Sequence, residues 1–205
     1  GLPASVPFDF PGAISLQFIS EQHADAQLGP WEAAGYFRFT HWNASGPLPQ
    51  WVSSGTILNG SMSNLLDHRG QSTSAGASWT YHFAGDGLHK GSGDERLLDG
   101  MIRTERGPAV NTPATVTLSG IPYATYDVVV YPGYIYPTRR GVIRIDGNTA
   151  TNRYFTSDTS PPFTGWREIT ATSLASIRPG NFARFRNLTG SSHSITLESI
   201  DNETV

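Results

Sequence analysis

Apolar and polar residues alternate with a period of two in several separate segments of the chain. This alternation is typical of β-strands that bury one face and leave the other in water. The apolar members are Ile14, Leu16 and Phe18; Phe37 and Phe39; Trp79, Tyr81 and Phe83; Val116 and Leu118; Ile195 and Leu197. We therefore expect half-buried strands at these positions.

Other segments extend the strand pattern. Residues 126–131 are apolar on both faces and rich in β-branched side chains, which predicts a strand in the middle of a sheet. Residues 142–146 end in Asp146-Gly147-Asn148, a hairpin signal that leads towards a strand near Tyr154 and Phe155. Helical periodicity is confined to residues 64–68 and 97–103, which are too short for typical helices.

These segments predict one fold class. Eight to ten strands separated by turn residues are typical of an all-β protein, and we expect a single antiparallel β-sandwich, jelly-roll-like in form. A sandwich of 205 residues needs no division into domains. We expect an N-terminal extension or arm over residues 1–12, the sandwich over residues 13–200 and a short tail over residues 201–205.

Composition narrows the choice of partners. Charged residues make up 15% of the chain, against about 25% in ordinary soluble proteins. A formal charge of −3 and a pI near 6.0 give no basic footprint for nucleic acid. No cysteine is present, and no apolar run approaches the roughly 18 residues of a transmembrane segment.

Two features predict a secreted protein at the cell surface or outside the cell. The sequence starts at Gly1 rather than Met, which we interpret as a mature N-terminus left by signal cleavage, with a trimmed chain as the alternative. Asn-X-Ser/Thr sequons make the chain a candidate glycoprotein, although a chain this rich in Ser and Thr also forms sequons by chance. The candidate sites are Asn43, Asn59, Asn187 and Asn202.

Six short motifs occur in order between residues 13 and 200. They are Ile14-Ser-Leu-Gln-Phe18, His41-Trp42-Asn43, Leu65-Leu66-Asp67 with Gly70, Ala77-Ser78-Trp79-Thr80, Gly93-Asp-Glu-Arg-Leu-Leu-Asp-Gly100, and Ser119-Gly-Ile-Pro-Tyr123 with Tyr126-Asp127-Val128. In these motifs the chain resembles a secreted β-sandwich module of planctomycete- and verrucomicrobial-type environmental bacteria. The resemblance implies export, a jelly-roll-like fold and contact with polysaccharide or the cell surface. It supplies no catalytic residues.

Aromatic and arginine residues between the strands are candidate contacts for sugar or for another subunit. Sugar rings stack on Trp and Tyr, while Trp, Tyr and Arg are also enriched where subunits meet. Packing at the end of the sandwich is the third alternative, whereas Trp42 and Trp79 lie within the strand pattern and are expected in the core. The candidates are Trp31, Trp51, Tyr134, Tyr136, Arg139, Arg140, Phe163, Trp166 and Arg167.

Catalytic and metal motifs are scarce. Asp94, Glu95 and Asp99 lie in a Gly-rich stretch that is a candidate Ca²⁺ site, with a solvated acidic turn as the alternative. The six histidines lack zinc-site spacing, and no nucleophile elbow or dinucleotide loop occurs. We therefore expect no other cofactor and no enzyme activity, although a pair of carboxylates for glycoside cleavage has no sequence signature.

Two functions remain. The first is a non-catalytic subunit of an extracellular filament or surface layer, whose partner is itself as a homopolymer. Phe8 and Phe10, in the extension, are then candidates for an arm that docks on a neighbouring subunit by strand addition or aromatic insertion. The alternative is a carbohydrate-binding module, whose partner is a polysaccharide held by the loop Trp and Tyr residues.

Overall fold

The structure is a computed structural model of the 205-residue chain. It describes residues 12–49, 56–86, 91, 93–103, 105–107, 110–133, 139–157 and 163–201. The protein is all-β, with short helical elements: α1 (Gly93–Asp99) and the 3-10 helices η1 (Glu21–Ala26), η2 (Thr149–Thr151) and η3 (Leu174–Ser176). The strands are β1 (Leu16–Ser20), β2 (Asn43–Leu48), β3 (Leu58–Met62), β4 (Gly76–Tyr81), β5 (Phe83–Asp86), β6 (Gly100–Arg103), β7 (Glu105–Gly107), β8 (Val110–Thr112), β9 (Ala114–Ser119), β10 (Tyr126–Val130), β11 (Arg140–Ile145), β12 (Arg153–Ser157), β13 (Arg178–Gly180), β14 (Ala183–Leu188) and β15 (His193–Ser199).

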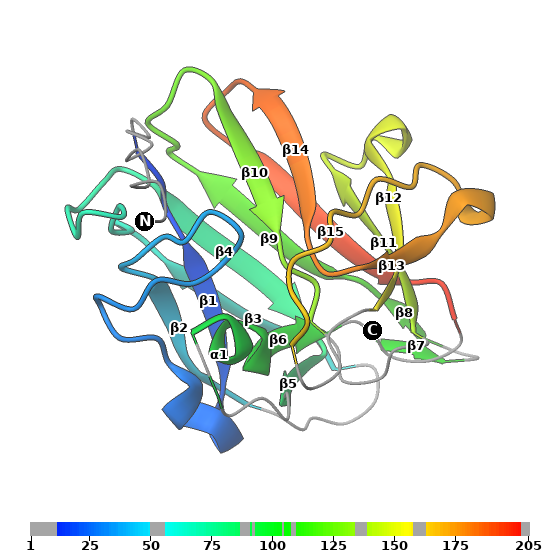
Figure 1. The fold of residues 1–205 in the computed structure, drawn as a ribbon, viewed down its shortest axis with the longest axis horizontal. Coiled ribbons are helices and arrows are strands. Elements are labelled where there is room, and N and C mark those ends of the chain that lie inside the picture. The colour runs from blue at the N-terminus through cyan, green and yellow to red at the C-terminus, as the bar shows by residue number, and fades with distance from the viewer. Residues whose placement is uncertain are drawn as a thin grey trace, which may run out of the picture.

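One large sheet forms the first layer. Its seven strands follow the order β13-β12-β11-β15-β9-β4-β3. Neighbouring strands are antiparallel except β12 and β13, which run parallel. The strands nearest in sequence are therefore not always neighbours, because β15, close to the C-terminus, lies between β9 and β11 (Figure 1).

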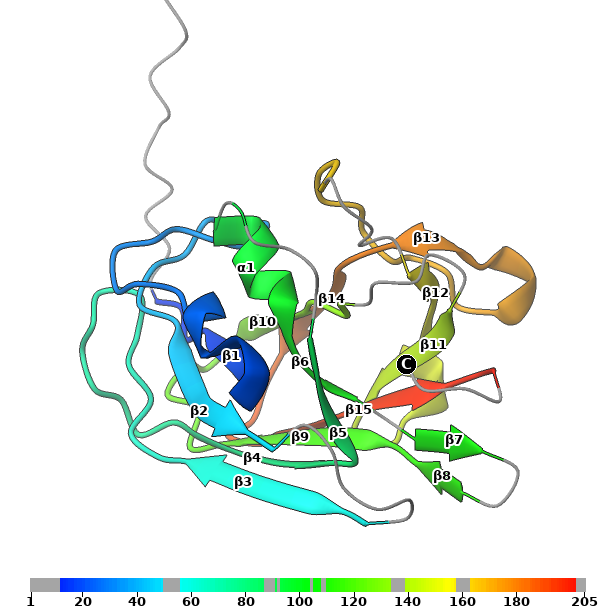
Figure 2. The same cartoon turned by 90° about the horizontal axis from the view of Figure 1, so that it is seen from below.

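Small sheets form the second layer. The parallel pair β1-β2 and the antiparallel pair β10-β14 each stand alone as two-stranded sheets. Both pairs lie on the same side of β4 and β9 (Figure 2). The described chain is thus sandwich-like, with a continuous first layer and a second layer made of separate pieces.

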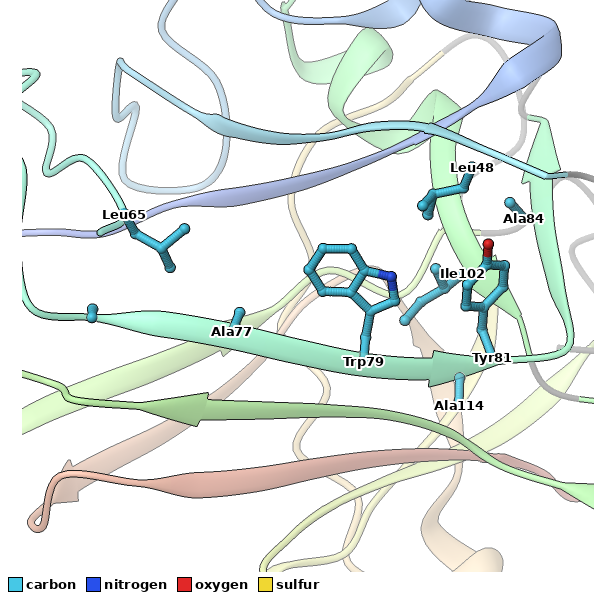
Figure 3. Packing of buried hydrophobic residues seen from close by; sticks show 9 residues of the cluster. Leu48, Leu65, Ala77, Trp79, Tyr81, Ala84, Ile102 and Ala114 are labelled. Atoms are coloured by element: carbon cyan, nitrogen blue, oxygen red, sulfur yellow. The ribbon is translucent and has the colours of Figure 1, made fainter. Parts of the chain in front are cut away.

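The two faces of the large sheet differ in chemistry. On β4, Trp79 and Tyr81 are buried, while Ser78 and Thr80 between them are exposed. Figure 3 shows Ala77, Trp79 and Tyr81 pointing together into a core cluster with Leu48, Ala84 and Ile102. A second cluster forms under β11, β12 and β14 around Ile143, Phe155 and Phe185. The period-two pattern therefore identified the buried face of this sheet correctly.

The hairpin predicted at residues 146–148 is confirmed. Asp146 and Gly147 have φ values of 54° and 65°, and the Asn148 N–H donates to the Ile145 oxygen at 2.9 Å. Two consecutive positive φ angles give the tight turn whose twist matches paired strands. The chain then passes through η2 before β12 pairs with β11.

Four expectations differ from the structure. The described residues form 15 strands rather than eight to ten, and two strand pairs are parallel. Residues 36–38 form turns rather than a strand, because Ala34 and Phe39 pair across them in a single bridge. The segment predicted in the middle of a sheet is β10, whose one partner among the described strands is β14. Residues 93–99 form α1, and residues 100–103, predicted as part of a helical turn, form β6.

Candidate functional site

A cavity of about 530 Å³ lies between the two layers, where the second layer is interrupted. One wall is residues 12–18, which include the start of β1, and the other wall is residues 125–131 of β10 and its flanks. The floor comes from the large sheet, including Val116 and Leu118 of β9. We call this cavity the β1–β10 groove. Figure 1 shows β4 and β9 behind the space that separates β1 from β10.

The wall formed by β1 is fixed from its outer side. The Gln17 side chain is buried and donates to the backbone oxygens of Ala26 and Arg96 at 3.1 and 3.0 Å. Its Oε1 accepts the Leu28 N–H at 3.0 Å. All hydrogen-bonding groups of one amide are thereby used. Leu16 and Phe18, on the other face of the strand, point towards the large sheet.

The wall formed by β10 is fixed by its partner strand. Asp127 forms an ion pair with Arg184 of β14 at 2.5 Å, and its Oδ1 accepts the Asn187 N–H at 2.9 Å. Val128 is buried in the cluster that contains Phe185 and Ile195. Since β14 is the one described strand that pairs with β10, the edge of β10 that faces β1 has no strand beside it.

The apolar lining of the groove is incompletely covered. Phe18 and Leu16 of β1 and Val116 and Leu118 of β9 all face the interior, yet each is only half-buried. Protein interiors are normally packed as densely as organic crystals, with few voids larger than a water molecule. A solvent-accessible groove of this size, lined largely by apolar groups, is therefore a place where further apolar atoms would be stabilised.

A loop that contains Phe37 and Phe39 lies over the groove. Phe37 and Phe39 of this loop line it, and the Arg184 guanidinium lies 4.9 Å from the centre of the Phe37 ring. The Tyr131 hydroxyl accepts the Tyr36 N–H at 3.0 Å and holds the loop to the end of β10. Burial raises the pKa of Tyr131 to about 12. Tyr131 is therefore a neutral, hydrogen-bonded phenol at the last residue of the β10 wall.

The opposite end of the groove lies at Gly12, the first residue that the structure describes. A side chain at Gly12 would meet the Tyr123 hydroxyl, so the backbone passes directly against that ring. Tyr123 and Gly12 both line the groove. The β1–β10 groove therefore runs from the Gly12 end, near the start of both strands, to the Tyr131 end.

The predicted aromatic contacts fall in separate places. Trp31 is 79% exposed and lies edge-on to His41, with 4.7 Å between ring centres. Trp166 is half-buried, 4.9 Å from the rings of both Tyr131 and Phe163, and Arg167 beside it is exposed. Trp79 is buried as expected, whereas Trp42 is only half-buried.

The other predicted contacts do not join these aromatics in one site. Arg140 forms an ion pair with Asp201 at 2.6 Å, and Arg139 precedes it at the start of β11. The structure thus shows no single aromatic platform among the described candidates. Phe8, Phe10, Trp51, Tyr134 and Tyr136 lie outside the described residues.

The acidic stretch is used within the fold. The Asp94 carboxylate accepts the Gly35 N–H and pairs with Arg38, both at 2.9 Å, and Asp99 is buried. Glu95 lies one residue further along α1. Among the described residues there is no cluster of three His, Asp or Glu side chains suited to a metal ion.

The sequons divide into two kinds. Asn43 is buried, with its amide donating to the Ser15 and Leu66 oxygens and accepting the Leu66 N–H. A glycan on Nδ2 would replace one of its two hydrogens and remove at least one of the two donated bonds, so the fold uses Asn43 as a structural residue. Asn59 and Asn187 are exposed, and Asn202 lies outside the described residues.

Sequence reasoning missed the β1–β10 groove. It identified the apolar residues of β1, β9 and β10 as strand faces, but it treated every such face as covered. A strand whose apolar face is uncovered has the same alternation as one whose face is covered. The groove is a property of which strands pair, and that was not visible in any one segment.

Among the described residues, no helix combines the length and the apolar character needed to cross a bilayer. The resemblance to a secreted bacterial module remains a prediction. Comparisons of this chain with protein-family models, with curated proteins and with solved structures found no match.

Proposed function

We propose that this protein is a non-catalytic, extracellular building block that self-associates into a filament or surface layer through the β1–β10 groove. The observation that carries this proposal is the groove itself, a cavity of about 530 Å³ with half-buried apolar walls. Burying one large apolar side chain contributes about 1.5–3 kcal/mol. A few such side chains from a neighbour would hold two subunits together.

The chemistry of the rest of the described surface agrees with this role. The outer face of the large sheet carries Ser78 and Thr80 on β4 beside Thr115 and Thr117 on β9. Hydroxyl groups of this kind keep a sheet face in water without adding charge. The exposed sequons at Asn59 and Asn187 are further support for an extracellular, glycosylated surface.

Sedimentation velocity over a hundredfold range of protein concentration, with negative-stain microscopy, tests the proposal. Leu118→Asp places a charge in the groove and should reduce self-association, because a buried unpaired carboxylate is costly. Thr117→Asp is the matched control, since it adds the same charge one residue away on the outer face. A wild-type chain that stays monomeric throughout would sink the proposal.

Glycan binding is the second candidate, favoured by one observation. Trp31 exposes 79% of its surface although Trp is usually well covered, and exposed Trp rings stack on sugars. A polysaccharide pull-down that Trp31→Ala abolishes and Leu174→Ala leaves intact would support it. Leu174 is a suitable control because it is also exposed and apolar.

A further inference from the structure

Residues 1–11 alternate strictly between two kinds of side chain. Every even position from 2 to 10 is apolar, and the odd positions are small, polar or proline. The even residues are Leu2, Ala4, Val6, Phe8 and Phe10. In an extended chain such a segment presents one continuous apolar face.

The prolines of this segment all lie on its other face. Pro3, Pro7 and Pro11 occupy odd positions, and successive residues of a strand direct their backbone groups to alternate sides. The missing N–H groups would therefore all fall on one edge of the extended segment. The opposite edge keeps an unbroken row of N–H and C=O groups, which suits pairing with one strand edge.

The β1 wall offers such an edge. The Ser15 oxygen accepts the Asn43 N–H, so the odd residues of this strand direct their backbone groups towards β2. Ile14 and Leu16, before the register irregularity between Gln17 and Ile19, consequently direct theirs to the opposite edge, towards the groove, whereas the Phe18 oxygen lies against Gly100 of β6. Across the groove, the edge of β10 away from β14 has no described strand beside it either.

The dimensions agree. Residues 2–10 would span roughly 30 Å at about 3.3 Å per residue, and each seven-residue wall of the groove spans roughly 23 Å. The apolar face of one extended segment therefore matches the length of the cavity, with a residue or so in excess at each end.

The arm is not directed into the groove of its own chain by a tight turn. A two-residue turn at Pro11-Gly12 would set Phe8 opposite Ser15, so the apolar face would point away from the floor. It would also need Ala13 to pair with Phe10. The Ala13 N–H instead donates to His68 Nδ1 at 3.2 Å, and its oxygen accepts the His68 N–H at 2.8 Å.

With a three-residue turn, the apolar face of residues 2–10 would point towards the floor of the groove. Such a turn requires a left-handed backbone conformation at its third residue. That position is Ala13, and neither Ala13 nor Gly12 has a positive φ. The backbone where the arm joins the described chain thus lacks the conformations of a short reversal. An arm that leaves its own subunit is free to enter the groove of another.

The geometry points to one occupant: the β1–β10 groove binds residues 2–10 of a second copy of this chain as an added strand, with Phe8 and Phe10 inserted towards the floor. This inference rests on the proposed function and names its contact. Because the arm of one copy enters the groove of the next, the contact is head-to-tail and builds an open polymer.

The absence of cysteine makes cross-linking a direct test. A Phe8→Cys chain is mixed with a Leu118→Cys chain, treated with a short bismaleimide and analysed by denaturing gel and intact mass. We expect a covalent heterodimer. Replacing Leu118→Cys with Thr117→Cys, on the outer face of β9, should reduce its yield at least tenfold.

Other outcomes overturn the inference. A chain carrying both Phe8→Cys and Leu118→Cys that links only within itself would place the arm in its own groove. Equal yields with Leu118→Cys and Thr117→Cys would show that the arm does not enter the groove. If wild-type chains still associate when either of these outcomes is found, the proposed self-association survives and only the arm contact is wrong. If wild-type chains stay monomeric, the proposed function and the arm contact both fail.

A peptide of residues 1–12 provides a second test on the intact protein. Added in excess, it should occupy the groove and shorten the assemblies seen by sedimentation. A Phe8→Ser peptide should need about 100-fold more to do so, because it loses the buried ring. An Asp9→Ser peptide should act like the original, since residue 9 faces outwards; equal loss in both peptides would contradict the strand orientation.

Discussion

Filling the β1–β10 groove with a larger side chain should stabilise the isolated chain. Val116 lies on the floor of this groove and is half-buried, so the ring of Val116→Phe would enter the cavity of about 530 Å³. The substitution adds four carbon atoms, and each buried methylene contributes about 0.8 kcal/mol, which sets an upper limit of about 3 kcal/mol. Because part of the ring would stay in water, we expect a gain of about 1–2 kcal/mol.

The expected sign is opposite to that of an ordinary core position. Ala77 lies on the same face of the large sheet but is buried at 3% exposure, and Ala77→Phe should cost about 1–3 kcal/mol or more by overpacking. Opposite changes in the stability of Val116→Phe and Ala77→Phe would therefore distinguish the open floor of the groove from the closed core on the same face of the sheet.

Urea unfolding followed by tryptophan fluorescence measures both variants, at protein concentrations below those that give self-association. Thermal unfolding gives a second measure of both variants, since in a chain of this length each kcal/mol of stability shifts the melting temperature by about 2–4 °C. Destabilisation of Val116→Phe by as much as the Ala77→Phe control would refute the reasoning, because it would show that the groove is already filled. Val116→Phe should also weaken self-association.

Three further predictions concern the rest of the fold. Gly60→Ala should lower stability by about 1–3 kcal/mol in urea unfolding, because its Cβ would lie 2.6 Å from the Trp79 ring, whereas Gly29→Ala, with open space around it, should be neutral. Burial alone would raise the pKa of Asp146, but the Ser194 N–H and His193 outweigh it and lower the pKa below its ordinary value of 3.8. The stability that Asp146 provides is therefore present above the unfolded-state pKa and is lost as pH falls through the folded-state pKa. Asp146→Asn should flatten the dependence of the urea midpoint on pH below about 4. An unchanged slope would contradict this expectation. Tyr131 should ionise near pH 12 in an ultraviolet titration, above the ordinary pKa of 10.0, and Tyr131→Phe should remove this late phase.

The fold class could be predicted because strand periodicity is local. Trp79 and Tyr81 alternate with hydroxyl residues, and β4 buries the two aromatics as the pattern requires. The turn at Asp146-Gly147 was equally local, since two residues that tolerate positive φ are sufficient to specify it. These parts of the sequence carry their own structural information.

Strand partners and buried polar residues could not be predicted in the same way. β10 is apolar on both faces, yet it pairs with one described strand, because the pairing depends on where β1 and β14 lie. Asn43 has the sequence of a glycosylation site but serves as a buried hydrogen-bonding link between residues 15 and 66. Gln17 likewise fixes the outer side of β1 through partners 9 to 79 residues away. Such roles depend on contacts that are distant in sequence.

The volume of the β1–β10 groove has a consequence for the response of the protein to hydrostatic pressure. Pressure favours the state of smaller volume, and the volume change on unfolding scales with the internal void that unfolding eliminates. A groove of about 530 Å³ whose apolar walls pack against a second chain rather than against solvent should therefore change the pressure at which the subunit unfolds. The polymer and the isolated subunit should then differ in their resistance to pressure.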